Sequence, residues 1–272
     1  MILFIIFIVI PTIAAIGLSF FSWNFFNTPT WVGGDNFIRM FTDAEVLQSL
    51  GVTFEFVILG VIPAIVLGFL LAVLVNANMP GVGILRVLYF VPVVVSAAVS
   101  GVLWGFLYDP RQGPAAAIFR FFGVSAPDVL NSQIFAVPAL VIIMIWGGIP
   151  IIMILYLAGL QRISPDLYSA AALDGAGRLR TLVSITWPNV AGTTFVVLVL
   201  QIIGFVSGSL DLALILTKGG PINTTRPLGL YSYQQAFSSQ DVGYASALSI
   251  LQLVIIVGIL GVVQVIIRRR GR

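Results

Sequence analysis

Residues 164–188 read SPDLYSAAALDGAGRLRTLVSITWP, a charge-bearing segment between two membrane-length apolar runs. Ser164 is suited to cap the start of a helix, so a short helix is predicted to begin here. Gly175 is suited to the left-handed backbone conformation that ends a helix. A second short helix is predicted over residues 178–185, and Pro188 is predicted to break the pattern after it. The stretch indicates two short helices joined by a glycine turn, which suits docking rather than catalysis.

The composition indicates a membrane protein. Of the 272 residues, 59% are hydrophobic and 8% are charged, whereas a soluble domain carries about 25% charged residues. So few charges cannot cover a globular surface, and lipid must therefore cover much of it. The net charge is only +3, which does not indicate nucleic-acid binding. The chain has no cysteine and no histidine, which excludes disulfides and thiolate or imidazole metal sites.

Apolar runs of about 20 residues are long enough to cross a bilayer as helices. We therefore expect an all-α integral membrane protein with six transmembrane helices in one domain, residues 1–272. The predicted spans are residues 1–21, 56–75, 87–108, 134–157, 190–210 and 245–267. Residues 22–55 are predicted to connect the first two spans, with a short surface helix around residues 37–50. Pro150, which follows two glycines, is a candidate break within the fourth span.

The basic residues favour one orientation, because cytoplasmic loops carry an excess of Lys and Arg. One set of alternate loops holds eight basic residues: Arg86, Arg162, Arg178, Arg180, Arg268, Arg269, Arg270 and Arg272. The opposite loops are much longer and hold five: Arg39, Arg111, Arg120, Lys218 and Arg226. We expect the first set, both termini and residues 164–188 to be cytoplasmic.

Residues 164–188 resemble the EAA motif of the inner-membrane permease subunits of ABC importers that work with a binding protein. The family pattern is Glu-Ala-Ala, three residues, Gly, nine residues, Ile, one residue and Leu-Pro. The corresponding residues here are Ser169, Ala170, Ala171, Gly175, Ile185, Trp187 and Pro188, with the spacing intact. The resemblance implies a cytoplasmic coupling helix between the fourth and fifth spans, which fits a cleft on an ATPase.

The residues that the resemblance assigns to ATPase coupling are Ser169, Ala170, Ala171, Asp174, Gly175 and Pro188. Ser169 replaces the family glutamate and Trp187 replaces the leucine. The missing carboxylate removes one polar contact to the ATPase, but the glycine turn and the alanine face are retained. Two roles for Asp174 remain open, namely contact with the ATPase and capping of the turn at Gly175.

Further strings along the chain resemble the branch of this family that carries sugars and glycerophosphodiesters. They include YLAGLQ at 156–161, LTKGGP at 216–221 and GYASA at 243–247. The resemblance implies a prokaryotic cytoplasmic membrane protein that works by alternating access. It implies a second permease subunit, two subunits that bind ATP and Mg, and an extracytoplasmic solute-binding protein. No cofactor is expected in this chain.

The sequence contains little that could support catalysis. The only lysine is Lys218, so no nucleotide-binding Gly-Lys-Ser/Thr loop is present. No histidine is available to activate a serine, and we expect no enzymatic activity. A self-sufficient secondary transporter is the alternative, but it would need intramembrane acids or broken helices in matched repeats. A membrane enzyme or assembly factor is a third interpretation, which the missing acid and base groups disfavour.

Polar and aromatic side chains within the spans are candidates for a solute path. The candidates are Ser100, Trp104, Trp146, Tyr156, Gln201, Ser207, Asp211 and Ser249. Other roles remain open, because serines in spans also serve helix packing and tryptophans also anchor span ends. Asp211 is also suited to capping or ion pairing at the outer boundary, and Gln201 to a subunit interface. The loop at 219–221 is either an ordinary turn or a contact with the binding protein or the path.

Overall fold

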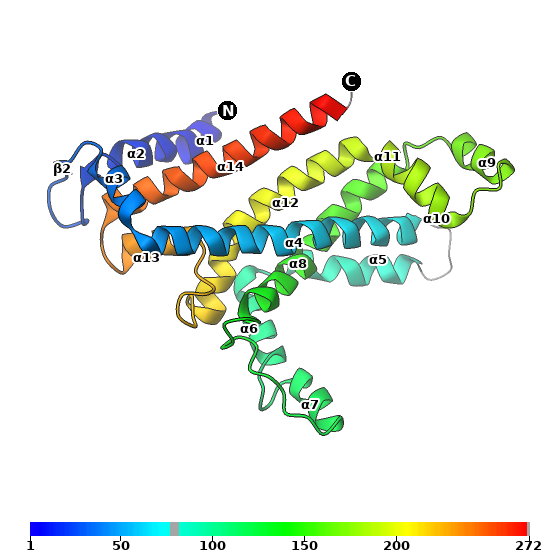
Figure 1. The fold of residues 1–272 in the computed structure, drawn as a ribbon, viewed down its shortest axis with the longest axis horizontal. Coiled ribbons are helices and arrows are strands. Elements are labelled where there is room, and N and C mark those ends of the chain that lie inside the picture. Colours follow the sequence, from blue (N-terminus) through cyan, green and yellow to red (C-terminus); the bar gives the residue numbers. More distant parts are fainter. Residues whose placement is uncertain (77–81, 271–272) are drawn as a thin grey trace.

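The computed structural model of the chain describes residues 1–76 and 82–270. The predicted loop at 76–86 lies partly outside the described residues, as does Arg272. The described chain is mostly helical, with long helices along a common direction (Figure 1). Figure 1 places α3 and α13 at one end of this bundle and α9 and α10 at the other.

The helices, in chain order, are α1 Ile2–Phe4, α2 Ile10–Leu18, α3 Asp35–Thr42, α4 Ala44–Asn76, α5 Val82–Phe90, α6 Ala97–Leu107, α7 Pro114–Phe121, α8 Ala136–Leu160, α9 Pro165–Leu173, α10 Arg178–Thr181, α11 Trp187–Asn189, α12 Ala191–Leu212, α13 Leu228–Phe237 and α14 Val242–Arg270. Between them lie the π-helical segments Ile5–Val9, Leu182–Thr186 and Ala213–Thr217 and the 3₁₀ turn Val91–Val94. Strands β1 Phe21–Ser22 and β2 Thr30–Trp31 pair antiparallel, with Phe21 opposite Trp31.

Four helices within the described residues are long and apolar enough to cross a membrane: Ala44–Asn76, Ala136–Leu160, Ala191–Thr217 and Val242–Val265. A fifth span results if the bent pair of α5 and α6 is counted as one crossing. The first predicted span is a shorter apolar helix, Ile2–Leu18, because the chain turns into β1 soon after it. The structure supports an all-α membrane protein, whereas six full spans in one domain remain a prediction.

Helix α4 begins at Ala44, so the predicted connection through residue 55 is too long. The helix predicted around residues 37–50 is two helices, α3 and the first turns of α4. Asp43 provides the start, because its Oδ1 accepts a hydrogen bond from the Glu45 N–H at 3.0 Å. The first turns are then buried on one face, at helical spacing, where α13 packs against them. The buried residues of these turns are Val46, Ser49, Val52 and Thr53.

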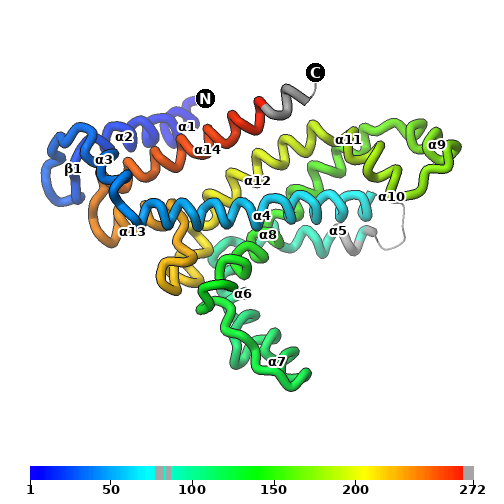
Figure 2. Tube along the Cα trace, viewed as in Figure 1, coloured from blue at the N-terminus to red at the C-terminus, as the bar shows by residue number. Residues whose placement is uncertain are grey.

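The third predicted span, residues 87–108, is wrong as a single straight helix, because the chain bends by 112° before α6 begins. Pro92 lies in the 3₁₀ turn before the bend and cannot donate a backbone hydrogen bond. Ser96 then starts α6, and its Oγ accepts a hydrogen bond from the Val99 N–H at 3.3 Å. As a result, α6 and α7 run in a different direction from the long helices, and α7 projects from the bundle (Figure 2).

Helix α8 runs unbroken from Ala136 to Leu160, so the candidate break at Pro150 is absent. Helices tolerate proline inside a membrane when neighbouring helices compensate for the lost backbone hydrogen bond. Pro150 is buried among such neighbours.

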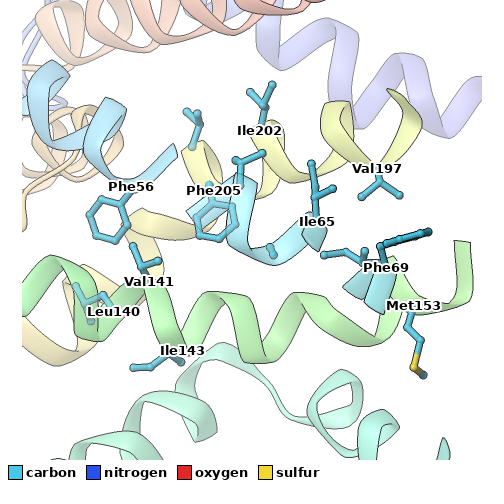
Figure 3. Packing of buried hydrophobic residues seen from close by; sticks show 14 of the residues in the cluster. Phe56, Ile65, Phe69, Leu140, Val141, Ile143, Met153, Val197, Ile202 and Phe205 are labelled. Carbon is cyan, nitrogen blue, oxygen red and sulfur yellow. The ribbon is translucent and has the colours of Figure 1, made fainter. Parts of the chain in front are cut away.

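Helices α4, α8 and α12 form the main hydrophobic core (Figure 3). Two glycines on α4 allow the close approach of the other two helices. A Cβ atom at Gly60 would lie 2.0 Å from the Phe205 ring, and one at Gly68 would lie 2.3 Å from Cγ2 of Ile152. In lipid, helices associate mainly through such close packing, so these contacts hold the three helices together.

Charged and aromatic groups close the end of the bundle at α3 and α13. Oδ2 of Asp43 accepts hydrogen bonds from the hydroxyls of Tyr231 and Tyr244, each at 2.6 Å. Arg226 forms an ion pair with Glu45 and lies over the Tyr231 ring, 4.6 Å from its centroid. Burial raises the pKa of Tyr231 to about 12, and the hydrogen bond to Asp43 acts in the same direction. The Tyr231 hydroxyl therefore stays protonated and remains a donor at neutral pH.

The close contact at Gly60 predicts a stability change that can be measured in detergent. We expect Gly60→Ala to lower the free energy of unfolding by about 1–3 kcal/mol, because the buried Phe205 ring must move. Gly51→Ala is the control on the same helix, where an added Cβ meets nothing within 4 Å. That variant should be neutral, or more stable by up to about 1 kcal/mol. Equal melting temperatures for the two variants would contradict the proposed packing.

Candidate functional site

The predicted docking stretch forms an elbow, which we define as residues 164–189. Its first helix, α9, begins directly after Ser164, the residue predicted to cap it. Ser164 is extended at ψ 132°, and its Oγ accepts a hydrogen bond from the Asp166 N–H at 3.3 Å. Pro165 occupies the first helical position, where its missing N–H costs nothing.

The turn after α9 has the geometry predicted from its glycine. Gly175 adopts φ +69°. The Gly175 N–H donates to the Ala172 carbonyl at 3.1 Å, and the Ala176 N–H donates to the Ala171 carbonyl at 2.9 Å. This pair of bonds is a Schellman motif, which satisfies the last carbonyls of α9. Since L-residues resist this φ, the sharp direction change depends on Gly175.

The second arm of the elbow is longer than predicted. It continues from α10 through the π-helical segment Leu182–Thr186 into α11. The predictions that it ends at residue 185 and that Pro188 breaks it are wrong, because the backbone stays helical through Trp187 and α11 extends to Asn189. The break falls at Val190, with φ −99° and ψ 13°.

Side-chain contacts join the two arms and attach them to the bundle. The Tyr168 and Thr186 hydroxyls are 3.4 Å apart, which links α9 to the second arm. The Trp187 ring meets the Phe69 ring edge-on, with centroids 4.7 Å apart, and lies 6.5 Å from the Tyr156 ring. Since Phe69 belongs to α4 and Tyr156 to α8, Trp187 connects the elbow to both helices.

The outer surface of the elbow is apolar and uncovered. Leu173 is 89% exposed and Leu179 is 74% exposed. The exposed Asp174 carboxylate accepts no hydrogen bond from the described residues, so it does not cap the turn. Among the other predicted coupling residues, Ala170 is exposed and Ala171 is buried. Ser169 is also exposed, and its Oγ donates to the Pro165 carbonyl at 3.2 Å.

A cavity of about 480 Å³ lies between α12, α8 and the bend before α6. It brings together three of the predicted path residues, Ser100, Gln201 and Asp211. The glycines that line it are Gly147, Gly148, Gly204 and Gly208. On α12, the lining positions 201, 204, 208 and 211 follow a three-four-three spacing, so they share one helix face. This face carries a polar group at each end and bare backbone between them.

The other predicted path residues lie outside this cavity. Trp104 and Trp146 pack against each other, with ring centroids 5.7 Å apart. Tyr156 is fully buried in the core, and its hydroxyl donates to Oγ1 of Thr194 at 3.1 Å, so its place in the path stays a prediction. Ser207 is exposed on another face of α12.

Ser249 lies apart from these residues, in a second cavity of about 450 Å³ between α12, α13 and α14. Its Oγ donates to the Ala245 carbonyl at 3.0 Å and lies 2.9 Å from the Ser232 hydroxyl. Ser246 and Gln252 line the same cavity.

Comparison with known proteins gives the family of the chain. Residues 56–272 match the family described as binding-protein-dependent transport system inner membrane component. The chain belongs to this family. The permease is 32% identical over 252 residues to the trehalose/maltose transport system permease protein MalF of Thermococcus litoralis, covering 92% of this chain and 85% of that one. It is 31% identical over 273 residues to the multiple sugar-binding transport system permease protein MsmF of Streptococcus mutans, covering 97% and 91%.

A solved structure shares the fold of the permease. It is a bacterial alginate ABC transporter in complex with an alginate pentasaccharide-bound periplasmic protein, and the similarity has a TM-score of 0.86. The aligned chains are 21% identical, and the match covers 100% of this chain and 92% of that one. Together with the family match, this makes the chain an ABC importer permease.

Sequence reasoning missed two features of the permease that the structure shows. The first is the attachment of the elbow through Trp187, which was noted only as a departure from the family leucine. A large aromatic residue close to a proline and an apolar run was the available signal. The second is the glycine face at Gly204 and Gly208, whose spacing of four residues was visible in the sequence.

The contacts of Trp187 predict a measurable loosening of the elbow. We expect Trp187→Ala to increase amide hydrogen exchange across residues 178–189 and to destabilise the protein by about 1–3 kcal/mol. The reason is the loss of ring contacts with Phe69 and Tyr156. Trp187→Leu restores the family residue and should keep most of the protection. Unchanged exchange in Trp187→Ala would show that the ring does not hold the elbow.

Proposed function

We propose that this permease imports a sugar, an oligosaccharide or a glycerophosphodiester by alternating access, driven by ATP hydrolysis on separate subunits. The observation that carries the proposal is the elbow, which exposes Leu173 and Leu179 at one end of the bundle while Trp187 packs against α4 and α8. Apolar side chains exposed beside charged ones mark a protein interface. The elbow therefore has both a docking surface and a connection to the spans.

The proposed partners follow from the family and from the uncovered surfaces. Two ATP-binding subunits, which hold ATP and Mg, would receive the elbow. A second permease would complete the path, because the cavity is bounded by this chain on one side and open on the other. An extracytoplasmic solute-binding protein would deliver the solute. The family description and the periplasmic protein bound in the alginate transporter support this last partner.

The proposed location is the cytoplasmic membrane of a prokaryote. In this orientation the elbow and both termini lie in the cytoplasm, and the network around Asp43 lies outside. The distribution of basic residues supports this orientation, since Arg178 and Arg180 lie in the exposed second arm of the elbow. The surface that faces the ATPases would then combine exposed leucines with two arginines and two aspartates, Asp166 and Asp174.

The cavity is the proposed solute site of this subunit. It offers the amide of Gln201, the hydroxyl of Ser100 and the carboxylate of Asp211 to sugar hydroxyls. The sugar names of the two relatives support this class of solute. Closure of the ATPase pair would move the elbow and, through Phe69 and Tyr156, displace α4 and α8. Because α8 forms one wall of the cavity, this displacement would switch the side from which the cavity is open.

The coupling role predicts that Gly175→Val separates ATP hydrolysis from transport. A side chain at φ +69° costs about 1–2 kcal/mol, so the turn should open and misplace Leu173. In proteoliposomes that contain the complete importer, we expect ATP hydrolysis to continue while uptake of radiolabelled maltose, trehalose or glycerol 3-phosphate is lost. Uptake driven by an ion gradient without ATP would instead favour a secondary transporter.

Gly177→Val is the control for this prediction. Gly177 has φ −70° and ψ 164°, which valine adopts readily, and an added Cβ there meets nothing within 4 Å. Coupling should therefore survive in this variant. Normal coupling in Gly175→Val would exclude the glycine turn from force transmission.

The proposed solute site predicts a block by a side chain placed in the cavity. An added Cβ at Gly204 meets no atom within 4 Å, so larger residues fit without disturbing the core. We expect Gly204→Leu to reduce uptake on the order of tenfold by filling the cavity, while the ATP-binding subunits still co-purify. Gly204→Ala adds only one methyl group and should retain most of the uptake. Full uptake in the leucine variant would place the path elsewhere.

A further inference from the structure

We infer that the cavity of this permease selects neutral or cationic saccharides and rejects anionic ones such as uronates and phosphate esters. The inference rests on the proposed function, because it treats the cavity as the solute site. It narrows the solute class, since relatives of this fold include an importer of the acidic polysaccharide alginate. The argument depends on the charges that line the cavity.

The carboxylate of Asp211 is the one charged group among the described residues that line the cavity. None of the described lining residues is Lys or Arg, so no cation is present there to bind a carboxylate or phosphate. No ion pair or hydrogen bond to another described residue engages the exposed Asp211 carboxylate. The described residues therefore leave the negative charge of Asp211 unneutralised. This charge acts on any solute that enters the cavity.

The start of α6, on the wall opposite Asp211, would attract an anion rather than repel it. Helix α6 begins beside the cavity at Ala97, and a helix start carries about half a positive charge. Ser96 reduces this effect, because its Oγ already accepts a hydrogen bond from the Val99 N–H. The full charge of Asp211 exceeds this partial charge. The electrostatic potential in the cavity is therefore negative.

The spacing of the polar groups also indicates the size of the solute. Gln201 and Asp211 are ten residues apart on one face of α12, which corresponds to about 15 Å along the helix. Gly204 and Gly208 lie between them and leave the backbone open to close approach. An oligosaccharide can contact both polar ends at once, whereas a monosaccharide is too short. The solute we infer is thus an uncharged or amino-bearing oligosaccharide.

Charge selection can be measured without knowing the solute. The chain has no cysteine, so Gly208→Cys introduces one thiol in this chain, about one helical turn from Asp211. An added Cβ at Gly208 meets only Cε of Met144, at 3.4 Å. In the complete importer, the modification rate of this chain is followed by mass with two methanethiosulfonates, one carrying trimethylammonium and one carrying sulfonate. Each rate is divided by the rate of the same reagent with 2-mercaptoethanol.

We expect the normalised rate of the cationic reagent to exceed that of the anionic reagent by about tenfold, as for unit charges about 6 Å apart in water. Adding Asp211→Asn should bring the ratio close to one, and adding Asp211→Lys should invert it. A ratio at or below one with Asp211 present would overturn the inference, including the case in which the partner permease supplies a compensating cation.

The same experiment distinguishes failure of the proposed solute site from failure of the charge preference. If neither reagent modified the cysteine, the cavity would be closed to water and could not be the solute path. Rapid modification with a ratio near one would overturn only the charge preference. Uptake by the complete importer provides a second test, in which cellotriose or the glucosamine trimer is compared with the glucuronate trimer of the same linkage. Preferential uptake of the glucuronate trimer would also overturn the inference.

Discussion

The close packing of α4 against α8 and α12 is the constraint on which the rest of the structure depends. Inside a bilayer there is no water to drive helices together, so contact area and fit must hold them. Gly60 and Gly68 provide that fit, because each has a side chain of a neighbouring helix where its own Cβ would be. Two of the helices that meet there, α8 and α12, flank the elbow in the chain and line the cavity. The packing that holds the bundle together therefore also positions the elbow and the cavity.

Only a few side-chain contacts lie between the elbow and the cavity. The Trp187 ring of the elbow meets Phe69 on α4 and lies beside Tyr156 on α8. Further along α8, Gly147 and Gly148 form part of the cavity wall. Packed interiors transmit displacement rather than absorb it, because they contain little free space. The elbow follows one end of α8, and the cavity lies against the middle of α8. This single helix therefore links the elbow to the cavity.

The sequence predicted features that depend on local chemistry better than features that depend on distant contacts. Ser164 and Gly175 were identified in advance, because caps and left-handed turns follow from residue type over a few positions. The extension of α4 back to Ala44 was not, because α13 buries one face of its first, partly polar turns, and the bend before α6 was missed although Pro92 marks it locally. Polarity within the spans pointed to Gln201 and Asp211, which line the cavity, and to Tyr156, which lies in the core. Its hydroxyl is satisfied by Thr194, which sequence alone does not reveal.

The separation of the cavity groups from the core has an evolutionary consequence. Gln201 and Asp211 contact the cavity but no other described polar group, whereas Phe205 on the same helix is fixed by Gly60. Under the proposed function, changes at positions 201 and 211 would alter the solute contacts while the packed glycines and the elbow stay the same. A lineage would then adapt to a new nutrient by changing these side chains.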